Sequence, residues 1–311
     1  MPPVSVVMPV HRVDEFIETA VKSVLADLSP EDELLIVLNG SALASFPQLA
    51  VAKSLGSNVR LLASEQAGIV PALNLGVTSA KHEFIARMDG DDVSLPGRFR
   101  IQAKFLASNP DIAVVGGQAY LICPHGKRVG LTHLPIRIRR SKFKPLLPKV
   151  VHPAVMFRKS LVLALGGYSN EYPHAEDHNL WNRVLSGRDI ANLIEPVLEY
   201  RIHPGQVSVE HQSNQVAQAL IATLDALAQN GVSSRWARVY CRYWEFLRIL
   251  TWENNRTRIK ALVKHPLFAI WFTITHARPI IGNLFYKKEF CQECLQENST
   301  RQSPNTTTSE I

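Results

Sequence analysis

The 311-residue sequence has few of the features that mark extracellular or membrane-spanning proteins. Its four cysteines are scattered along the chain, which argues against a disulfide framework and favours a reducing compartment. No basic stretch followed by an apolar run resembles a signal peptide near the start. The longest apolar run near the C-terminus, Leu267 to Thr275, is far shorter than the ~20 residues of a membrane span. We therefore expect a cytoplasmic protein.

Two common nucleotide-binding signatures are also missing. The apolar run Val4 to Val10 is followed by HRVDEF, and not by the G-x-G-x-x-G turn of a dinucleotide-binding fold, which argues against NAD. The P-loop pattern G-x-x-x-x-G-K-[ST] does not occur, so a P-loop ATPase is excluded. The net charge is +7, but no recognisable motif accompanies it, and we expect no nucleic-acid partner.

The sequence does contain an ordinary globular composition, with 46% hydrophobic and 20% charged residues. The first 115 residues alternate between strand-like and helix-like patterns, with helices expected in 14–28, 69–80 and 96–109. This alternation predicts an α/β fold with a Rossmann-like, mostly parallel sheet flanked by helices. The expected strands are Val4–Val10, Glu33–Leu38, Val59–Leu62, Phe84–Met88 and Ile112–Val115.

The secondary-structure pattern of the remaining residues differs from that of the first 115. Residues 116–200 are more irregular, with strands expected at Ala154–Phe157 and at 192–200, and the pattern from about 212 onward is helical. We expect a catalytic α/β domain over residues 1–210 and a helical extension over 211–295. The polar residues 296–311 are expected to be disordered.

Three aspartates lie within four positions in the segment ARMDGDDVSL. Asp89, Asp91 and Asp92 come directly after a strand-like apolar run. In open α/β sheets, ligands bind beyond the carboxyl ends of the strands. A divalent cation shared with substrate phosphates would neutralise the repulsion between these carboxylates. The alternative is a surface loop of solvated acids, and the residues alone leave both interpretations open.

Four segments, the second of which contains these aspartates, resemble glycosyltransferase family two when taken in order. That family contains inverting enzymes of the GT-A fold that use nucleotide-diphosphate sugars. The resemblance covers roughly residues 3–210, and its specificity lies in the ordered, correctly spaced set and not in any single segment. The segments are SVVMPVHRVDEFIETAVKSVL, EQAGIVPALNLGVTSAKHEFIARMDGDDVSLPGRF, VHPAVMFRKSLVLALGGYSNEYPHAEDHNLWNRV and YRIHPGQVS.

The resemblance implies a metal site formed by the family's D-x-D motif. Asp91 would be the main ligand of Mn²⁺ or Mg²⁺, with Asp89 near the ribose and the metal. Asp92 would bind the metal or shape the loop, and His203 would complete the metal or diphosphate site. A histidine before a proline is alternatively an ordinary turn residue. Carboxylates and phosphate oxygens are the ligands that Mg²⁺ prefers.

The resemblance also implies a catalytic pair in AEDHNLW. Asp177 would be the general base that takes the proton from the acceptor hydroxyl, and Glu176 would support it or bind the acceptor. An inverting transfer needs one such base on the side opposite the leaving group. The alternative is a helix start decorated with acids, which the helix dipole favours in any case.

The donor nucleotide is implied to lie over the first strand ends. Pro9 and Val10 would frame it, Gly68 and Asn74 match the segment beside the nucleoside, and His152 would lie near the donor sugar or serve as a packing histidine. The sequence departs from the family after the second strand, where Leu38 and Asn39 replace two aspartates. Asn39 can still accept a hydrogen bond from the base, and the usual uridine donor is expected.

The implied partners are the nucleotide-sugar donor and a saccharide or lipid-linked saccharide acceptor. Residues 235–290 mix aromatic and basic side chains, which suits either docking on an anionic membrane or helices that cap the domain. Two other functions remain possible at this point: a sugar-nucleotide pyrophosphorylase and a nucleotide-sugar-binding protein without catalysis. The first normally carries a glycine-rich basic loop after the first strand, and the second has no use for a base.

Overall fold

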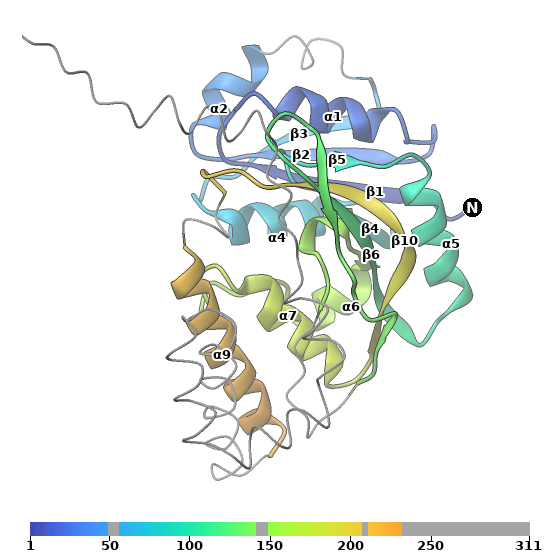
Figure 1. Cartoon of the computed structure of the whole chain (residues 1–311), viewed down its shortest axis with the longest axis vertical. Helices are drawn as coiled ribbons and strands as arrows, with labels where there is room; N and C mark the ends of the chain where they lie inside the picture. The colour runs from blue at the N-terminus through green and yellow to red at the C-terminus, as the bar shows by residue number, and fades with distance from the viewer. Residues whose placement is uncertain (49–55, 141–148, 207–210, 232–311) are drawn as a thin grey trace, which may run out of the picture.

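The computed structural model describes residues 1–48, 56–140, 149–206 and 211–231. Within these ranges the strands form one ten-stranded sheet. Figure 1 shows the sheet with helices on both of its faces. The strands are β1 (Val4–Val10), β2 (Glu33–Leu38), β3 (Val59–Ala63), β4 (Phe84–Arg87), β5 (Val93–Ser94), β6 (Ile112–Ile122), β7 (Arg128–Leu131), β8 (Arg137–Ile138), β9 (Met156–Arg158) and β10 (Asp189–Arg201).

The helices fall close to the positions that the apolar periodicity predicts. In the first of them, apolar residues at helical spacing are buried while the intervening charged residues face outward. Two short 3₁₀ turns, Phe46–Gln48 and His152–Ala154, complete the regular structure of the described ranges. The α-helices are α1 (Ile17–Leu25), α2 (Ala42–Ser45), α4 (Ile69–Ser79), α5 (Arg98–Ser108), α6 (Lys159–Ala164), α7 (Glu176–Leu185) and α9 (Gln212–Gln229).

The sheet has the order β3-β2-β1-β4-β9-β6-β10-β5, with β7 paired to β6 and β8 to β10. The neighbours from β3 to β4 are parallel, as the alternation of the first 115 residues predicts. Beyond β4 the sheet is mixed, because β9 runs antiparallel to both β4 and β6 while β6 and β10 are parallel. The α/β prediction is confirmed, and the mostly parallel arrangement holds for the N-terminal half of the sheet.

Two apolar cores lie on the two faces of the sheet. Strand residues such as Val6 and Met8 pack with α1 and α5 on one face. The next residue along β1, Val7, packs with α4, α6 and α7 on the other. Gly76 of α4 makes this close packing possible, because a Cβ there would lie only 2.3 Å from Cγ1 of Val7. Burial on both faces explains why the central strands are almost continuously apolar.

The topology brings distant segments together at the carboxyl ends of β1, β2 and β4. The register pairs Val10 with Leu38 and Val7 with Arg87, so these strand ends share one edge of the sheet. The short strand β5 then pairs antiparallel with β10. This pairing carries the segment after β4 back to the C-terminal end of β10, and it therefore positions the acidic turn beside residues more than a hundred positions later.

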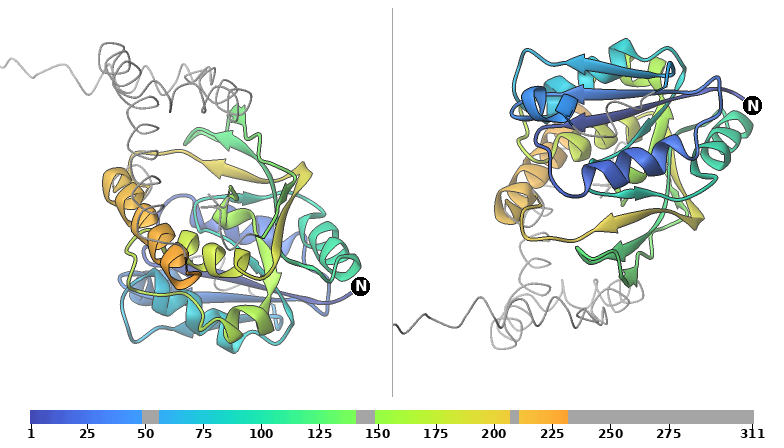
Figure 2. Two further views of the ribbon diagram at one scale, coloured as in Figure 1. Left: turned by 90° about the horizontal axis from the view of Figure 1, so that it is seen from below. Right: turned by 90° about the horizontal axis from the view of Figure 1, so that it is seen from above.

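Helix α9 packs against α7, and the two views of Figure 2 show them side by side. Its start at Gln212 agrees with the predicted start of a helical region. In the part of the chain that the structure describes, no helix combines the length and apolar character needed to cross a bilayer. The predicted membrane-docking segment 235–290 and the predicted disordered tail 296–311 lie outside the described residues.

Candidate active site

The acidic turn after β4 brings three carboxylates together. One carboxylate oxygen from each of Asp89, Asp91 and Asp92 lies within 4.8 Å of the other two. Asp92 is fully buried, and its Oδ2 has no hydrogen-bond partner within the described structure. A buried, unpaired carboxylate oxygen beside two further carboxylates suits a divalent cation, which accepts oxygen ligands. The residues present therefore fit the metal site that the sequence predicts.

One neighbouring residue and two residues from a distant segment hold these aspartates. Asp89 forms an ion pair with Arg87, Asp91 Oδ2 lies 3.0 Å from Nε2 of His203, and Asp92 Oδ1 accepts a 2.8 Å hydrogen bond from the backbone N–H of Arg201. The guanidinium of Arg201 donates to the backbone carbonyl of Asp91. The structure thus brings together all four of the predicted metal ligands.

The electrostatics of the turn also favour a bound cation. Burial raises the pKa of Asp89 to about 6, while the Arg87 guanidinium opposes this rise. Burial raises the pKa of Asp92 well above its usual range, and the charges of Asp91 and Asp89 raise it further. Both shifts reflect the cost of several negative charges in one buried turn, and a divalent cation removes that cost by favouring the ionised forms.

The predicted catalytic pair occupies the first turn of α7. Asp177 is 27% exposed, and its Oδ1 accepts a 2.7 Å hydrogen bond from the backbone N–H of His178. Glu176 is buried, and burial together with the charge of Asp177 raises its pKa to about 7. Burial likewise raises the pKa of Asp177. The two acids do lie at a helix start, yet Asp177 is also close enough to the acidic turn for its charge to contribute to the raised pKa of Asp89.

His152 lies beside this pair. Its Nδ1 is 4.0 Å from Oδ2 of Asp177, and its Nε2 lies 3.0 Å from the hydroxyl of Tyr168. The ring packs edge-on against Trp181, with centroids 6.0 Å apart. Burial, and then the charge of Arg87, lowers the pKa of His152 well below its usual range, so the ring is neutral. His152 is a packing histidine that borders the site, and its contact with a donor sugar remains a prediction.

The residues predicted to bind the nucleoside surround the ends of β1 and β2. Pro9 and Val10 end β1 beside Val37 and Leu38. Asn39 is only 1% exposed, and its amide bonds His11 Nδ1 at 2.8 Å and the Gly68 carbonyl at 3.3 Å. The amide of Asn39 therefore links three loops of the protein. A contact between this amide and the base remains a prediction.

Asn74 is held in a similar way. Its Nδ2 donates to the backbone carbonyl of Tyr168, and its Oδ1 accepts from the backbone N–H of the same residue, both at 2.9 Å. This double hydrogen bond fixes the turn that carries Tyr168 against α4. Asn74 therefore has a structural role that the sequence did not indicate, and its predicted contact with the donor remains untested.

Sequence reasoning missed two arginines of the site. Arg87 ends β4 and Arg201 ends β10, and both are almost fully buried. The signal for Arg87 was a single charged residue within an apolar strand, two positions before the first aspartate. Arg201 gave no comparable local signal, because its partners in the acidic turn lie about 110 residues away in the sequence.

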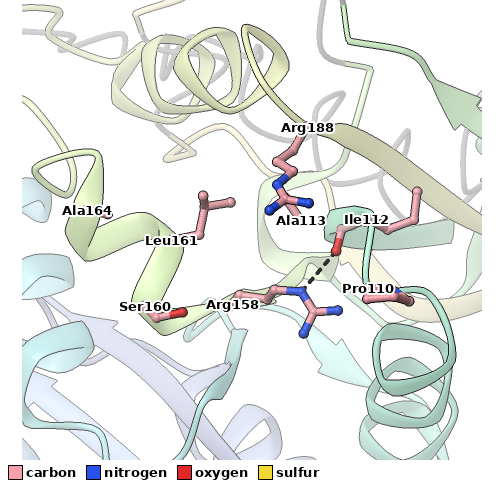
Figure 3. Close-up of a pocket in the computed structure, with 8 residues that line it drawn as sticks. All are labelled: Pro110, Ile112, Ala113, Arg158, Ser160, Leu161, Ala164 and Arg188. Atoms are coloured by element: carbon pink, nitrogen blue, oxygen red, sulfur yellow. Dashed lines mark hydrogen bonds between the residues drawn. The ribbon is translucent and has the colours of Figure 1, made fainter.

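A cavity of about 270 Å³ lies elsewhere on the protein, and Figure 3 shows the side chains that line it. It is bordered by Ile112 at the start of β6 and by Arg188 just before β10. The cavity therefore lies at the amino ends of these two strands, whereas the acidic turn and His203 follow strand carboxyl ends. None of its lining residues belongs to the predicted site.

Comparisons with known proteins agree with this arrangement. The family model described as "Glycosyl transferase family 2" matches residues 5–166, which is more than half of the chain. The chain is 34% identical over 204 residues to the O-antigen biosynthesis glycosyltransferase WbnJ of Escherichia coli, covering 64% of this chain and 80% of WbnJ. It is 27% identical over 202 residues to an Escherichia coli UDP-Gal:alpha-D-GlcNAc-diphosphoundecaprenol beta-1,3-galactosyltransferase, covering 63% and 73% of the two chains.

Solved structures share the fold at low sequence identity. S. aureus TarS 1-349 in complex with UDP-GlcNAc matches with a TM-score of 0.55 at 15% identity, covering 84% of this chain and 80% of that chain. The mannosyltransferase PcManGT from Pyrobaculum calidifontis, in complex with GDP-Man and Mn²⁺, matches with a TM-score of 0.51 at 15% identity, covering 92% and 88%. The GT-A prediction is confirmed by these structures, and the pyrophosphorylase alternative is set aside. The chain belongs to glycosyl transferase family 2.

Proposed function

We propose that this glycosyltransferase is a metal-dependent, inverting enzyme that transfers a sugar from a nucleoside diphosphate sugar to a saccharide hydroxyl. One observation carries the proposal: three carboxylates cluster in the acidic turn, and the carboxylate of Asp177 lies close enough for its charge to act on Asp89. The first group suits a cation and a diphosphate, and the second suits a general base. A binding protein without catalysis would have no use for Asp177.

Each acidic residue then has a distinct role. Asp91, held by His203, is the main metal ligand, and Asp89 and Asp92 complete the acidic turn. A divalent cation bound there stabilises the negative charge that develops on the leaving diphosphate. Glu176 supports the base or binds the acceptor from the first turn of α7.

The reaction needs one proton transfer and one displacement. Asp177 takes the proton from the acceptor hydroxyl as that oxygen attacks the anomeric carbon. The bond between the anomeric carbon and the phosphate oxygen breaks on the opposite side, and the configuration of the anomeric carbon is inverted. The raised pKa of Asp177 makes it a stronger base than an exposed aspartate, because burial disfavours its charged form.

We propose a uridine diphosphate sugar as the donor. TarS has been solved with UDP and with UDP-GlcNAc, and one relative is named for UDP-Gal. PcManGT, by contrast, was solved with GDP-Man. The same structure contains Mn²⁺, and Mn²⁺ or Mg²⁺ is the cation proposed for the acidic turn.

We further propose a lipid-linked saccharide as the acceptor. The name of one relative describes a GlcNAc-diphosphoundecaprenol acceptor, and two other relatives are named for O-antigen and amylovoran biosynthesis. An acceptor of this kind lies at a membrane surface, where the basic and aromatic residues of 235–290 would dock from the cytoplasmic side. Residues 1–210 would then form the catalytic domain and 211–295 the membrane-facing extension.

The test is to incubate the protein with Mn²⁺, UDP-galactose or UDP-GlcNAc, and a GlcNAc-diphospholipid acceptor, and to measure released UDP. We expect release that depends on acceptor and metal, and a product whose anomeric configuration, determined by NMR, is opposite to that of the donor. The matched control is the exposed Glu171→Gln, five residues before the acidic pair. A product with retained configuration would contradict the proposal, as would UDP release that persists in EDTA.

A further inference from the structure

Arg87 differs from the other buried arginines of this protein. Among the described residues, three arginines are almost fully buried, with exposures of 4% for Arg87, 0% for Arg98 and 5% for Arg201. Arg98 donates to the backbone carbonyls of Arg87 and Pro153 at 2.7 and 2.8 Å. Arg201 donates to three backbone carbonyls, those of Asp91, Cys123 and Pro124. Where a buried arginine has a purely structural role, this fold surrounds it with acceptors.

The guanidinium of Arg87 is used on one side only. Its Nη2 contacts the carboxylate of Asp89, whereas Nε and Nη1 are buried without a hydrogen-bond partner within the described structure. A guanidinium carries five N–H donors in a fixed planar fork, and a buried donor without an acceptor is unfavourable. The unused donors therefore indicate an acceptor that arrives with a ligand.

Arg87 lies on the face of the sheet that packs against α7, the helix that carries the catalytic pair. Ile85, two positions earlier on β4, packs in the core that contains Leu180 and Trp181 of α7, and side chains two apart on a strand share a face. Burial raises the pKa of Glu176 and Asp177, and the positive charge of Arg87 opposes that rise in both. Arg87 thus lies between the acidic turn and the start of α7.

That position is where the transferred sugar must lie if the proposed function is correct. In a displacement with inversion, the anomeric carbon is placed between the leaving diphosphate and the attacking oxygen. The diphosphate would be held at Asp91 and the attacking oxygen at Asp177, so the sugar spans the space between them.

Resting on that proposed function, we propose that Arg87 binds the transferred sugar, with Nε and Nη1 donating to a sugar oxygen while Nη2 holds Asp89. The sugar oxygen is a neutral one, such as a hydroxyl or an amide carbonyl. The charge of Arg87 already interacts with the carboxyl groups of Asp89, Asp92, Glu176 and Asp177, and an acidic sugar would add a further negative charge to this acidic site.

The experiment compares nucleotide binding with sugar-nucleotide binding by calorimetry in Mn²⁺. Wild type, Arg87→Lys and Arg87→Met are each titrated with UDP, UDP-galactose and UDP-GlcNAc. Arg87→Lys should bind UDP within about threefold of wild type and lose about tenfold or more of its affinity for the sugar nucleotide that wild type prefers. Arg87→Met, which also removes the positive charge beside Asp89, should lose at least as much sugar-nucleotide affinity. The lysine keeps the charge beside Asp89 but lacks the planar fork, so it should not restore sugar binding. Arg188→Lys, an exposed arginine at the other edge of the sheet, is the control.

Several outcomes would overturn the inference. If Arg87 only neutralises the acidic turn, Arg87→Lys will behave like wild type with all three ligands. If Arg87 only supports the fold, UDP and sugar-nucleotide affinities will fall together, with a lower midpoint of thermal unfolding. Wild type that binds no uridine nucleotide in Mn²⁺ would contradict the proposed donor itself. Wild type that binds UDP normally, with variants that keep their sugar affinity, would contradict the role of Arg87 alone.

Discussion

The two acidic ends of the site are supported by different kinds of interaction. The acidic turn after β4 is held by a guanidinium and by residues that follow β10: Arg87 pairs with Asp89, and His203 contacts Asp91. The acidic pair at the start of α7 is held by the helix itself and by neutral partners, of which His152 is one. The carboxylate of Asp89 in the acidic turn therefore has a countercharge beside it. The acidic pair of α7 is stabilised by the helix dipole, and burial raises its pKa values.

This difference matches what each end has to do. A turn that binds a cation and a diphosphate must hold its carboxylates in place, and the contacts with Arg87 and His203 do this while burial raises the pKa values of Asp89 and Asp92. A general base must accept a proton, and a partly buried carboxylate without a strong ion pair has the raised pKa that this requires. The comparison predicts that the two ends respond differently to mutation and to pH.

The largest effect is expected from changing one carboxylate at each end. Asp177→Asn should lower turnover by roughly 10²–10⁴-fold, the usual worth of a general base, with little change in UDP affinity. Asp91→Asn should instead abolish the Mn²⁺ dependence of UDP binding, because it removes the main proposed metal ligand. Turnover assays and calorimetry on both variants measure the two effects separately. An equal loss of UDP affinity in Asp177→Asn would make that residue part of the nucleotide site.

The next largest effect concerns the support of the acidic turn. Arg201→Met keeps an apolar side chain but removes the guanidinium, which lies over the Phe16 ring and donates to three backbone carbonyls. Leaving buried acceptors unpaired should lower the free energy of unfolding by roughly 3 kcal/mol or more, as measured by urea denaturation. The exposed Arg188→Met should change it by less than about 0.5 kcal/mol. Equal effects in the two variants would mean that Arg201 does not support the turn.

A smaller effect, dependent on pH, is expected at Glu176. Its pKa in the folded protein is about 7, against an ordinary value of 4.5, so the folded state binds a proton more tightly than the unfolded state. Glu176 therefore costs no stability below about pH 4.5 and destabilises the fold progressively as the pH rises through 7. As the pH rises from 4.5 to 8, the free energy of unfolding of Glu176→Gln should increase by about 1–3 kcal/mol relative to that of wild type. Parallel stability curves for the two proteins would contradict the shift.

The smallest effect is expected where α9 meets α7. The hydroxyl of Thr223 lies 2.8 Å from Nε2 of His178 and accepts a 3.2 Å hydrogen bond from Asn182. Thr223→Val preserves the shape and should lower the free energy of unfolding by about 1–2 kcal/mol. Thr78→Val, whose hydroxyl bonds only to carbonyls of its own helix, is the matched control. If the two variants are equally stable, Thr223 does not anchor α9.

The elements that the sequence predicted well are those set by local pattern. Strands such as Val4–Val10 and the helix of residues 17–25 have clear apolar periodicity, and their faces are buried as that periodicity requires. Strands β5 and β8, of two residues each, carry no such signal, because they exist only by pairing with β10. The sequence pattern also did not predict that β9 runs antiparallel to β4 and β6, which makes the sheet mixed.

The site divides in the same way. The cluster of Asp89, Asp91 and Asp92 is visible in four consecutive positions, so a metal site could be proposed from the sequence beside the alternative of a solvated loop. The contact between Asp91 and His203 spans 112 residues, and only the family resemblance suggested it. The amides of Asn39 and Asn74 illustrate the limit of resemblance, because the protein itself occupies both of them. The hydrogen bonds of a buried amide depend on which distant segments pack against it, and the spacing of residues in the sequence does not predict this.

Strand β10 has a consequence for building chimeras from related enzymes. It begins at Asp189, just after α7 with its acidic pair, and it ends at Arg201, which supports the acidic turn and precedes His203 by two residues. A crossover placed where the family match stops, after residue 166, would replace both the proposed base and the residues after β9 that support the acidic turn. A junction after His203 leaves both ends of the site with their original partners. Recombination at that junction would exchange the C-terminal part while inheriting the reaction chemistry unchanged.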